Sequence, residues 1–231
     1  MTLAGKHILV TAGPTHEPID PVRYIANRSS GKQGHAIAAA LAKLGAETLL
    51  VSGPTREADP AGVAVRHVET AAQMLAACEA ALPVDVAVCA AAVADWRPAR
   101  AGNQKLKKNG ATTKSLELTA NPDILATLAQ SKTARPRLVV GFAAETEQVL
   151  EHARGKLERK GAHLIVGNDV TIPGAGFESE NNAAVLVDRD GHRETGMVPK
   201  HRLADLILDR AAELGEAGVA APQAGRAARV R

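Results

Sequence analysis

Apolar positions along the chain follow two alternating patterns. Short runs of β-branched residues, such as residues 7–11, predict strands, and alanine-rich stretches with apolar residues three or four apart predict helices. Within residues 34–44, Ile37, Leu41 and Leu44 share one helical face. Further strands are predicted at residues 47–51, 63–68, 84–90, 137–141, 163–166 and 183–187, and further helices at 71–81, 122–130, 147–160 and 200–214.

The order of these elements indicates the fold class. Strands that alternate with helices are typical of parallel βαβ units. Residues 84–90 are almost continuously apolar, as expected of a strand that is covered on both faces. The sequence therefore predicts an α/β protein with an open, mostly parallel sheet and helices on both faces.

Two segments break the alternation. Residues 96–115 are polar, basic and contain glycine, which predicts a loop or flap with little regular structure. From Gly215 onward the chain consists largely of Ala, Gly, Pro and Arg without periodicity, which predicts a disordered tail over residues 215–231. We therefore expect a single domain over residues 1–214, with a flap at 96–115.

Composition excludes several classes of protein. The formal net charge is only +3, and no stripe of Lys and Arg interleaved with aromatic residues accompanies it, so we expect no nucleic-acid partner. Cys78 and Cys89 lie in apolar segments and are not spaced as metal ligands, which suits a reducing compartment. No apolar run has the length of a membrane span, and residues 1–6 lack the features of a secretion signal. We expect a cytoplasmic protein without a membrane partner.

Two turns near the start of the chain are candidates for phosphate binding. Gly13 lies in a sharp turn after the first predicted strand, and Ser29, Ser30 and Gly31 precede the first predicted helix. A helix start offers unpaired N–H groups and the positive end of the helix dipole to a phosphate. Ordinary turn chemistry explains the same residues, and the spacing of the glycines fits neither a dinucleotide fingerprint nor a Walker A motif.

Polar side chains next to the predicted strand ends add further candidates. Arg23 and Asn27 lie in a long connection between the first strand and its helix, where a binding role competes with a surface salt bridge for Arg23. Asp95 follows small residues at a strand end, including Ala92, and suits either a divalent cation, a ribose hydroxyl or a turn.

Lysines form the third group of candidates. Lys105 and Lys108 belong to a charge run in the predicted flap, which serves either as a solvated face or as a mobile clamp on phosphates. Lys156 and Lys160 lie four residues apart on one helical face, and Phe142 ends a strand, where it would stack on a base or fill the core. Residues 121–123 predict a helix start with Asn121 as the cap, Pro122 as the first helical residue and Asp123 in the first turn.

In this combination the motifs resemble the phosphopantothenoylcysteine synthetase family, the phosphopantothenate–cysteine ligases of coenzyme A biosynthesis. The similarity extends from about residue 7 to residue 214, and its most specific pieces are residues 11–15, 20–25 with Asn27, 29–32, 91–95, 105–108, 121–124 and 141–146. The resemblance implies a Rossmann-like, dimeric fold. It also implies a two-step reaction, in which a nucleoside triphosphate activates the phosphopantothenate carboxylate as an acyl-nucleotide and the cysteine amine then displaces the nucleoside monophosphate. Bacterial members use CTP, and Mg²⁺ would bridge its phosphates.

The resemblance implies roles for individual residues. Lys105, assisted by Lys108, would stabilise the negative charge that develops at the α-phosphate. Asn27 would orient the acyl-nucleotide carbonyl in the second half-reaction, Arg23 would position an anionic substrate group, and Asp95 would contribute to the Mg²⁺ site. Turn chemistry and resemblance together assign the nucleotide site to Gly13, Ser29, Ser30, Gly31, Ala92, Asp95, Lys105, Lys108, Pro122, Asp123, Ile124, Phe142, Lys156 and Lys160.

Partners and alternatives follow from the same comparison. We expect a homodimer, and in many bacteria the ligase is fused behind a flavin-dependent phosphopantothenoylcysteine decarboxylase, which no segment of this chain resembles. An ATP-using version of the ligase stays open as an alternative. A nicotinamide-dependent oxidoreductase is disfavoured because the second predicted strand ends in residues 52–54 without an acid for the ribose hydroxyls. A nucleotide sensor without catalysis would need none of Arg23, Asn27 and Lys105.

Overall fold

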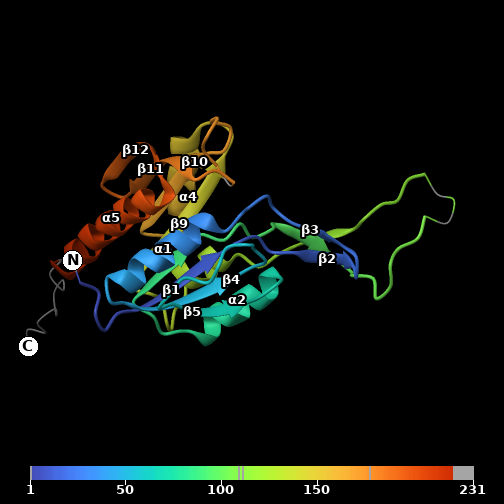
Figure 1. Ribbon diagram of the computed structural model, residues 1–231, viewed down its shortest axis with the longest axis horizontal. Helices are drawn as coiled ribbons and strands as arrows, with labels where there is room; N and C mark the ends of the chain where they lie inside the picture. Colours follow the sequence, from blue (N-terminus) through green and yellow to red (C-terminus); the bar gives the residue numbers. More distant parts are fainter. Residues whose placement is uncertain (1, 109, 111, 177, 221–231) are drawn as a thin grey trace, which may run out of the picture.

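A twisted sheet runs through the centre of the protein (Figure 1). The computed structural model describes residues 2–108, 110, 112–176 and 178–220, and in this part of the chain the sheet has eight strands in the order β12-β11-β10-β9-β6-β1-β4-β5. Pairing is parallel from β10 to β5 and antiparallel for β11 and β12. The bounds of the strands are β1 His7–Ala12, β4 Glu47–Ser52, β5 Ala64–His67, β6 Val86–Cys89, β9 Leu138–Glu145, β10 Leu164–Asp169, β11 Asn181–Asp188 and β12 Gly191–Pro199.

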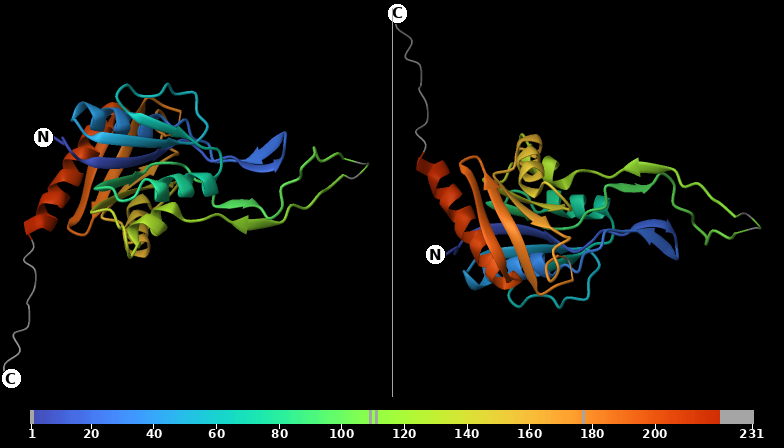
Figure 2. Two further views of the ribbon diagram at one scale, coloured as in Figure 1. Left: turned by 90° about the horizontal axis from the view of Figure 1, so that it is seen from below. Right: turned by 90° about the horizontal axis from the view of Figure 1, so that it is seen from above.

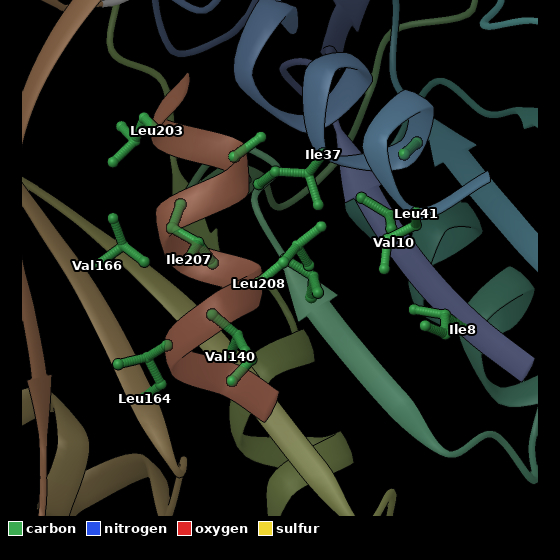
Figure 3. Packing of buried hydrophobic residues seen from close by; sticks show 14 of the residues in the cluster. Ile8, Val10, Ile37, Leu41, Val140, Leu164, Val166, Leu203, Ile207 and Leu208 are labelled. Atoms are coloured by element: carbon green, nitrogen blue, oxygen red, sulfur yellow. The ribbon is translucent and has the colours of Figure 1, made fainter. Parts of the chain in front are cut away.

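Five helices in the described residues cover the two faces of this sheet. They are α1 Lys32–Lys43, α2 Ala71–Ala80, α3 Ile124–Ala129, α4 Val149–Lys160 and α5 Lys200–Ala220. On one face Ile37 of α1 and Ile207 of α5 pack against Val10, Val140 and neighbouring strand residues (Figure 3). On the other face α2, α3 and α4 pack against the same strands, around Met74, Leu128 and Ala153 respectively. The predicted α/β fold, mostly parallel and covered on both faces, is confirmed.

Close packing places the start of α1 at the carboxyl edge of the sheet. A Cβ atom on Gly34 would lie 2.5 Å from Cβ of Ala12, so the first turn of α1 rests directly on the end of β1. Gly31, just before the helix, has φ 81°, a left-handed conformation that strongly favours glycine. The turn after β1 and the start of α1 are therefore held side by side.

A second glycine fixes the turn after β4 against the turn after β1. A Cβ atom on Gly53 would lie 1.8 Å from the carbonyl oxygen of Pro14, which belongs to the backbone and has little room to move. We therefore expect Gly53→Ala to lower the free energy of unfolding by about 3 kcal/mol or more. Urea denaturation measures the change.

Gly215→Ala serves as the control for this substitution. Gly215 lies within α5 and has no heavy atom within 4 Å of its Cβ position. Alanine is the better helix former there, so we expect a gain of about 0.5–1 kcal/mol. A Gly53→Ala protein as stable as Gly215→Ala would show that the close approach at Pro14 is not needed.

Each strand and helix predicted from periodicity has a counterpart, with ends shifted by a few residues. The predicted cap at Asn121 is wrong: Asp123 caps α3 by accepting a hydrogen bond from the Ala126 amide, and the helix begins at Ile124. The side chain of Asn121 instead donates to the Ala94 carbonyl oxygen at 2.7 Å and accepts from Arg97 at 3.0 Å. Two neighbouring loops therefore use the group that would otherwise have capped the helix.

The predicted tail is also corrected. Helix α5 continues to Ala220, so residues 215–220 are helical, and residues 221–231 lie outside the described residues. Ala and Glu around Gly215 are good helix formers and outweigh the glycine in this stretch. The prediction also omitted β12, an edge strand whose exposed, polar residues lack the apolar alternation that marks a half-buried strand.

An arm projects from the carboxyl edge of the sheet (Figures 1 and 2). It consists of residues 17–25, which contain the hairpin β2 Glu17–Asp20 and β3 Arg23–Ile25, and of residues 96–120, which begin with β7 Trp96–Pro98 and end with β8 Leu118–Ala120. The strand at residues 96–98 replaces the start of the predicted flap, while the described residues between β7 and β8 are without helix or strand, as predicted. Gly102 donates its amide to the Ile19 carbonyl oxygen at 2.9 Å, which ties the two halves of the arm together.

Candidate functional site

A cleft of about 380 Å³ lies at the carboxyl edge of the sheet. Its floor comes from the ends of β1, β6, β9 and β10, through residues such as Thr11, Cys89, Phe142 and Asn168. Open parallel sheets bind their ligands at this edge, where the connecting loops diverge. The location therefore suits a small-molecule site.

Most of the predicted site residues meet in this cleft. The residues that line it are Asn27, Ser29, Ser30, Gly31, Ala92, Asp95, Pro122, Asp123, Ile124, Phe142, Lys156 and Lys160. They come from three separate connections and from α3, β9 and α4, so the sheet topology rather than sequence proximity brings them together. Gly13 lies outside the lining, and its carbonyl oxygen instead accepts a hydrogen bond from the Ala92 amide at 2.9 Å.

One end of the cleft, which we call the α3/α4 end, carries two lysines of α4. Lys160 forms an ion pair with Asp123, and Lys156 donates to the Phe142 carbonyl oxygen at 2.6 Å. Burial lowers the pKa of Lys156 because desolvation disfavours its charged form. Burial alone would raise the pKa of Asp123, but the hydrogen bonds from Lys160 and from the Ala126 amide, together with the charges of Lys160 and Lys156, outweigh this effect and the pKa is lowered. This end presents positive charge beside the aromatic ring of Phe142.

The loop at residues 90–95 crosses the middle of the cleft and is fixed from both sides. The backbone amide of Ala94 donates to the Thr15 hydroxyl at 3.0 Å, and the backbone amide of Asn121 donates to the Asp95 carbonyl oxygen at 2.8 Å. Asn27 donates its side-chain amide to the Val93 carbonyl oxygen at 2.9 Å. The small residues of this loop and the side chain of Asn27 therefore form a rigid middle section.

The other end, which we call the α1/α5 end, includes the turn before α1. The Ser29 and Ser30 hydroxyls accept from the amides of Gly31 and Lys32, both at 3.4 Å. Thr55 donates its hydroxyl to the Ser30 carbonyl oxygen at 2.5 Å. The two serines thus stabilise the turn before α1 and also line the cleft, and Lys32 adds a positive charge at this end.

Three predicted residues lie on the arm and outside the cleft. Arg23 forms an ion pair with the buried Asp20 and donates to the Leu106 carbonyl oxygen at 2.9 Å. The Arg23 guanidinium holds the pKa of the Asp20 carboxyl well below its usual range. Lys105 and Lys108 lie on the exposed part of the arm on either side of this anchor point. A single chain does not bring these cations to the residues that line the cleft.

Residues 3–214 match the family described as the DNA/pantothenate metabolism flavoprotein C-terminal domain. This chain belongs to that family. The resemblance drawn from the motifs is therefore confirmed at the level of the family.

Relatives of known name support the assignment to this family. The chain is 46% identical over 214 residues to the coenzyme A biosynthesis bifunctional protein CoaBC of Vibrio parahaemolyticus, covering 92% of this chain and 53% of that protein. It is 47% identical over 210 residues to CoaBC of Escherichia coli K12, covering 90% of this chain and 52% of that protein. The chain thus spans about half the length of the curated relatives it matches. The crystal structure of the C-terminal domain of a CoaBC protein superposes with a TM-score of 0.78 at 40% identity, covering 93% of this chain and 98% of that domain.

The structure adds residues to the cleft that the sequence did not single out. Lys200, Asn168 and Asn182 line the α1/α5 end together with Lys32 and Gly176. In the sequence, Lys200 is the first residue of a predicted helix and lies 167 positions from Gln33. In the structure, the side chain of Gln33 donates a hydrogen bond to the carbonyl oxygen of Lys200 at 3.1 Å. No local signal marks such a residue, because only the packing of α5 beside α1 brings it to the cleft.

The cation requirements of the site can be tested against the side chains present. Among the described residues no group of three or more His, Cys, Asp or Glu side chains is arranged to hold a metal ion. Asp95 is exposed at the cleft and stands alone as a carboxylate on its loop. Mg²⁺ is commonly held by one or two carboxylates together with phosphate oxygens and water, so Asp95 fits a cation that arrives with a nucleotide. In the same described part of the chain, no helix is long and apolar enough to cross a membrane.

Proposed function

We propose that this chain condenses 4′-phosphopantothenate with L-cysteine at the expense of CTP. The products are phosphopantothenoylcysteine, CMP and pyrophosphate, and the intermediate is an acyl-cytidylate. The observation that carries the proposal is a single cleft with lysines at both ends and Asn27 beside its middle loop. The proposal also draws on the 40% identity to the C-terminal domain of CoaBC.

The chemistry of the first step explains the positive charge. A carboxylate that attacks an α-phosphate brings two anions together, so the site needs cations where negative charge develops. Lys156 and Lys160 hold the nucleotide at the α3/α4 end, with Phe142 against the base, and the backbone around Asp123 and Ile124 reads the cytosine edge. Asp95 would hold Mg²⁺ together with the triphosphate, and the ion would supply neutralisation of the phosphate charge. Lys105, assisted by Lys108, stabilises the transition state.

The second step depends on the middle of the cleft. Asn27 is held there by its hydrogen bond to the Val93 carbonyl oxygen. From this position it orients the acyl-cytidylate carbonyl for attack by the cysteine amine. The amine forms the new amide bond as the bond to the CMP phosphate oxygen breaks, and one proton leaves the nitrogen.

A homodimer completes the site. Arg23 and Lys105 lie on the arm, whose surface exposes Val22, Tyr24, Trp96, Leu116 and Leu118. Exposed apolar side chains gathered on a projecting segment are typical of an association surface. In a symmetric dimer each arm would reach the cleft of the other chain and bring Arg23 and Lys105 to the reacting groups.

The proposed reaction gives the chain a place beside a second activity. The relatives named above are bifunctional proteins twice its matched length, and the product still carries the cysteine carboxylate. We propose a flavin-dependent phosphopantothenoylcysteine decarboxylase, in the same polypeptide or separate, as the enzyme that consumes it. The free thiols of Cys78 and Cys89 suit the reducing cytoplasm, where we place the reaction.

Pyrophosphate release tests the proposal. The protein, phosphopantothenate, cysteine, CTP and Mg²⁺ are expected to yield one pyrophosphate for each phosphopantothenoylcysteine formed, as measured by a coupled phosphate assay and mass spectrometry. Omitting phosphopantothenate is the control and should abolish release. Turnover with ATP but not CTP would support the ATP-using ligase, and no release with either nucleotide would contradict the ligase. An effect of the protein on NADH fluorescence would instead favour the oxidoreductase.

A further inference from the structure

The α1/α5 end of the cleft is lined by two lysines from neighbouring helix starts. Lys32 is the first residue of α1, and Lys200 is the first residue of α5 on the same face of the sheet. Burial, and after it the nearby charge of Lys32, lower the pKa of Lys200 to about 8. Two ammonium groups held this near each other favour an anion beside them.

The anion beside Lys32 is supplied by the chain itself. Glu180, the residue before β11, forms an ion pair with the Lys32 amine, which also donates to the Glu178 carbonyl oxygen at 3.3 Å. The hydrogen bond from Lys32 lowers the pKa of Glu180, and the same hydrogen bond raises the pKa of Lys32, so both groups are charged at neutral pH. An acidic side chain of the protein therefore holds an amine that lines the ligand cleft.

The two partners differ in how easily they can leave this pair. The side chain of Lys32 is 25% exposed, whereas that of Glu180 is 82% exposed. The backbone around Glu180 is fixed, because the Lys200 amide donates to the Glu180 carbonyl oxygen at 2.9 Å and the Lys200 Nζ donates to the Gly176 carbonyl oxygen at 2.8 Å. Exposed ion pairs contribute little stability. The Glu180 carboxylate can therefore rotate into solvent while the segment that carries it stays in place.

The proposed function brings a second anion to the same amine. The base of CTP lies against Phe142 at the α3/α4 end, and its α-phosphate meets the acid carboxylate in the middle section, near Asn27. The remaining phosphates then continue to the turn before α1, where a helix start offers amide groups and Lys32 offers its charge. A phosphate beside Lys32 and the carboxylate of Glu180 repel each other, so only one of them is favoured there.

We infer that Glu180 holds the place of the terminal phosphate of CTP beside Lys32, leaves when the triphosphate binds, and returns as pyrophosphate departs. This inference rests on the proposed function. The exchange weakens binding of the triphosphate, because the ion pair must break and the displaced carboxylate still repels the phosphates nearby. The pair forms again as pyrophosphate leaves, which favours release of this product. Glu180 thus sets nucleotide affinity and product release and takes no part in the chemical step.

Nucleotide affinity tests the inference. Glu180→Gln keeps the size of the side chain but removes its charge, so it should bind CTP with Mg²⁺ about 3–10-fold more tightly than wild-type protein in calorimetric titration. Added pyrophosphate should inhibit turnover of this variant at concentrations lower by about the same factor. Glu180→Ala, which also lacks the charge, should show the same gain, and melting curves check that both exposed substitutions leave the fold intact. Equal or weaker binding of CTP by these variants would overturn the inference.

Glu178→Gln is the matched control. Glu178 is exposed in the same segment, and it reaches Lys32 through its backbone carbonyl oxygen rather than through its carboxylate. The substitution therefore removes the same charge two residues away and should change the affinity for CTP less than about twofold. An equal gain in Glu178→Gln and Glu180→Gln would show that general negative charge weakens binding, and it would contradict an exchange at Lys32.

A double-mutant cycle with Lys32 tests whether the two anions compete for this amine. Lys32→Met removes the amine, so Glu180→Gln should improve the affinity for CTP less than about twofold in this background. The remaining gain reflects repulsion between the carboxylate and the phosphates without an ion pair to break. A gain in the Lys32→Met background as large as in the wild-type background would contradict competition for Lys32.

Titration of CTP without phosphopantothenate or cysteine separates this inference from the proposed ligase. A gain in affinity that depends on both Glu180 and Lys32, in a protein without turnover, would contradict the ligase alone. Turnover with CTP, without tighter binding in Glu180→Gln, would contradict this inference alone. Absence of CTP binding by the wild-type protein would contradict both.

Discussion

Lys105→Gln is expected to lower pyrophosphate release about 100–1000-fold, the effect of removing one preorganised group from developing charge. Glutamine keeps most of the side-chain length and polarity but carries no charge. Because the charge develops when the carboxylate attacks the α-phosphate, the loss falls on acyl-cytidylate formation. Rapid-quench assays of a single turnover, with labelled CTP, should therefore show little acyl-cytidylate and little CMP.

The arm offers a matched control for this substitution. Lys107 lies two positions further along the same exposed segment and has no assigned role. Lys107→Gln removes the same charge from the same arm and should retain activity within about twofold, since an exposed charge at this position interacts only weakly with distant groups. A Lys105→Gln protein that is no slower than Lys107→Gln would show that the arm acts through its general positive charge rather than through one amine.

The sequence was sufficient for the fold because each parallel strand is covered on both faces. Val10 and Leu9, adjacent in β1, are both fully buried, and they belong to different core clusters. Such strands are continuous apolar runs and are easily recognised. The edge strand β12 and the hairpin β2–β3 have mostly exposed or polar residues, so their pairing depends on neighbours that the local pattern does not reveal.

The site was predictable only where loops carry distinctive residues. Asp95 and Phe142 stand at predicted strand ends and Asn27 stands in the long connection after the first strand, and the cleft indeed gathers them. Lys200 and Asn182 come from the antiparallel end of the chain, where the strand-to-helix order gives no indication that they meet the first helix. For the arm the prediction from sequence failed in the opposite way. Arg23 and Lys105 were easily singled out in the sequence, yet they do not line the cleft of their own chain.

Asn27→Asp is expected to stop the reaction at the second step. The Asn27 amide donates to the Val93 carbonyl oxygen at 2.9 Å, and a carboxylate there would face that oxygen without a proton to share. The acyl-cytidylate would still form, so one pyrophosphate per site should be released in a burst while CMP release falls about 100-fold or more. Arrest before pyrophosphate release, as in Lys105→Gln, would contradict the division of roles.

Mixing these two inactive proteins distinguishes an arm that acts on its own chain from one that acts on a partner. If the arm reaches the partner's cleft, a mixed dimer has one site with both substitutions and one site with neither. Random exchange between subunits should then restore about a quarter of wild-type activity, a gain of about 25-fold or more over either variant. If the arm serves its own cleft, each site in the mixed dimer keeps one substitution and mixing restores nothing. Lys105→Gln mixed with itself controls for dilution, and dimer exchange is followed with tagged subunits. Because each subunit has an exposed arm and a cleft whose lining does not include Arg23 or Lys105, we expect the mixture to be active.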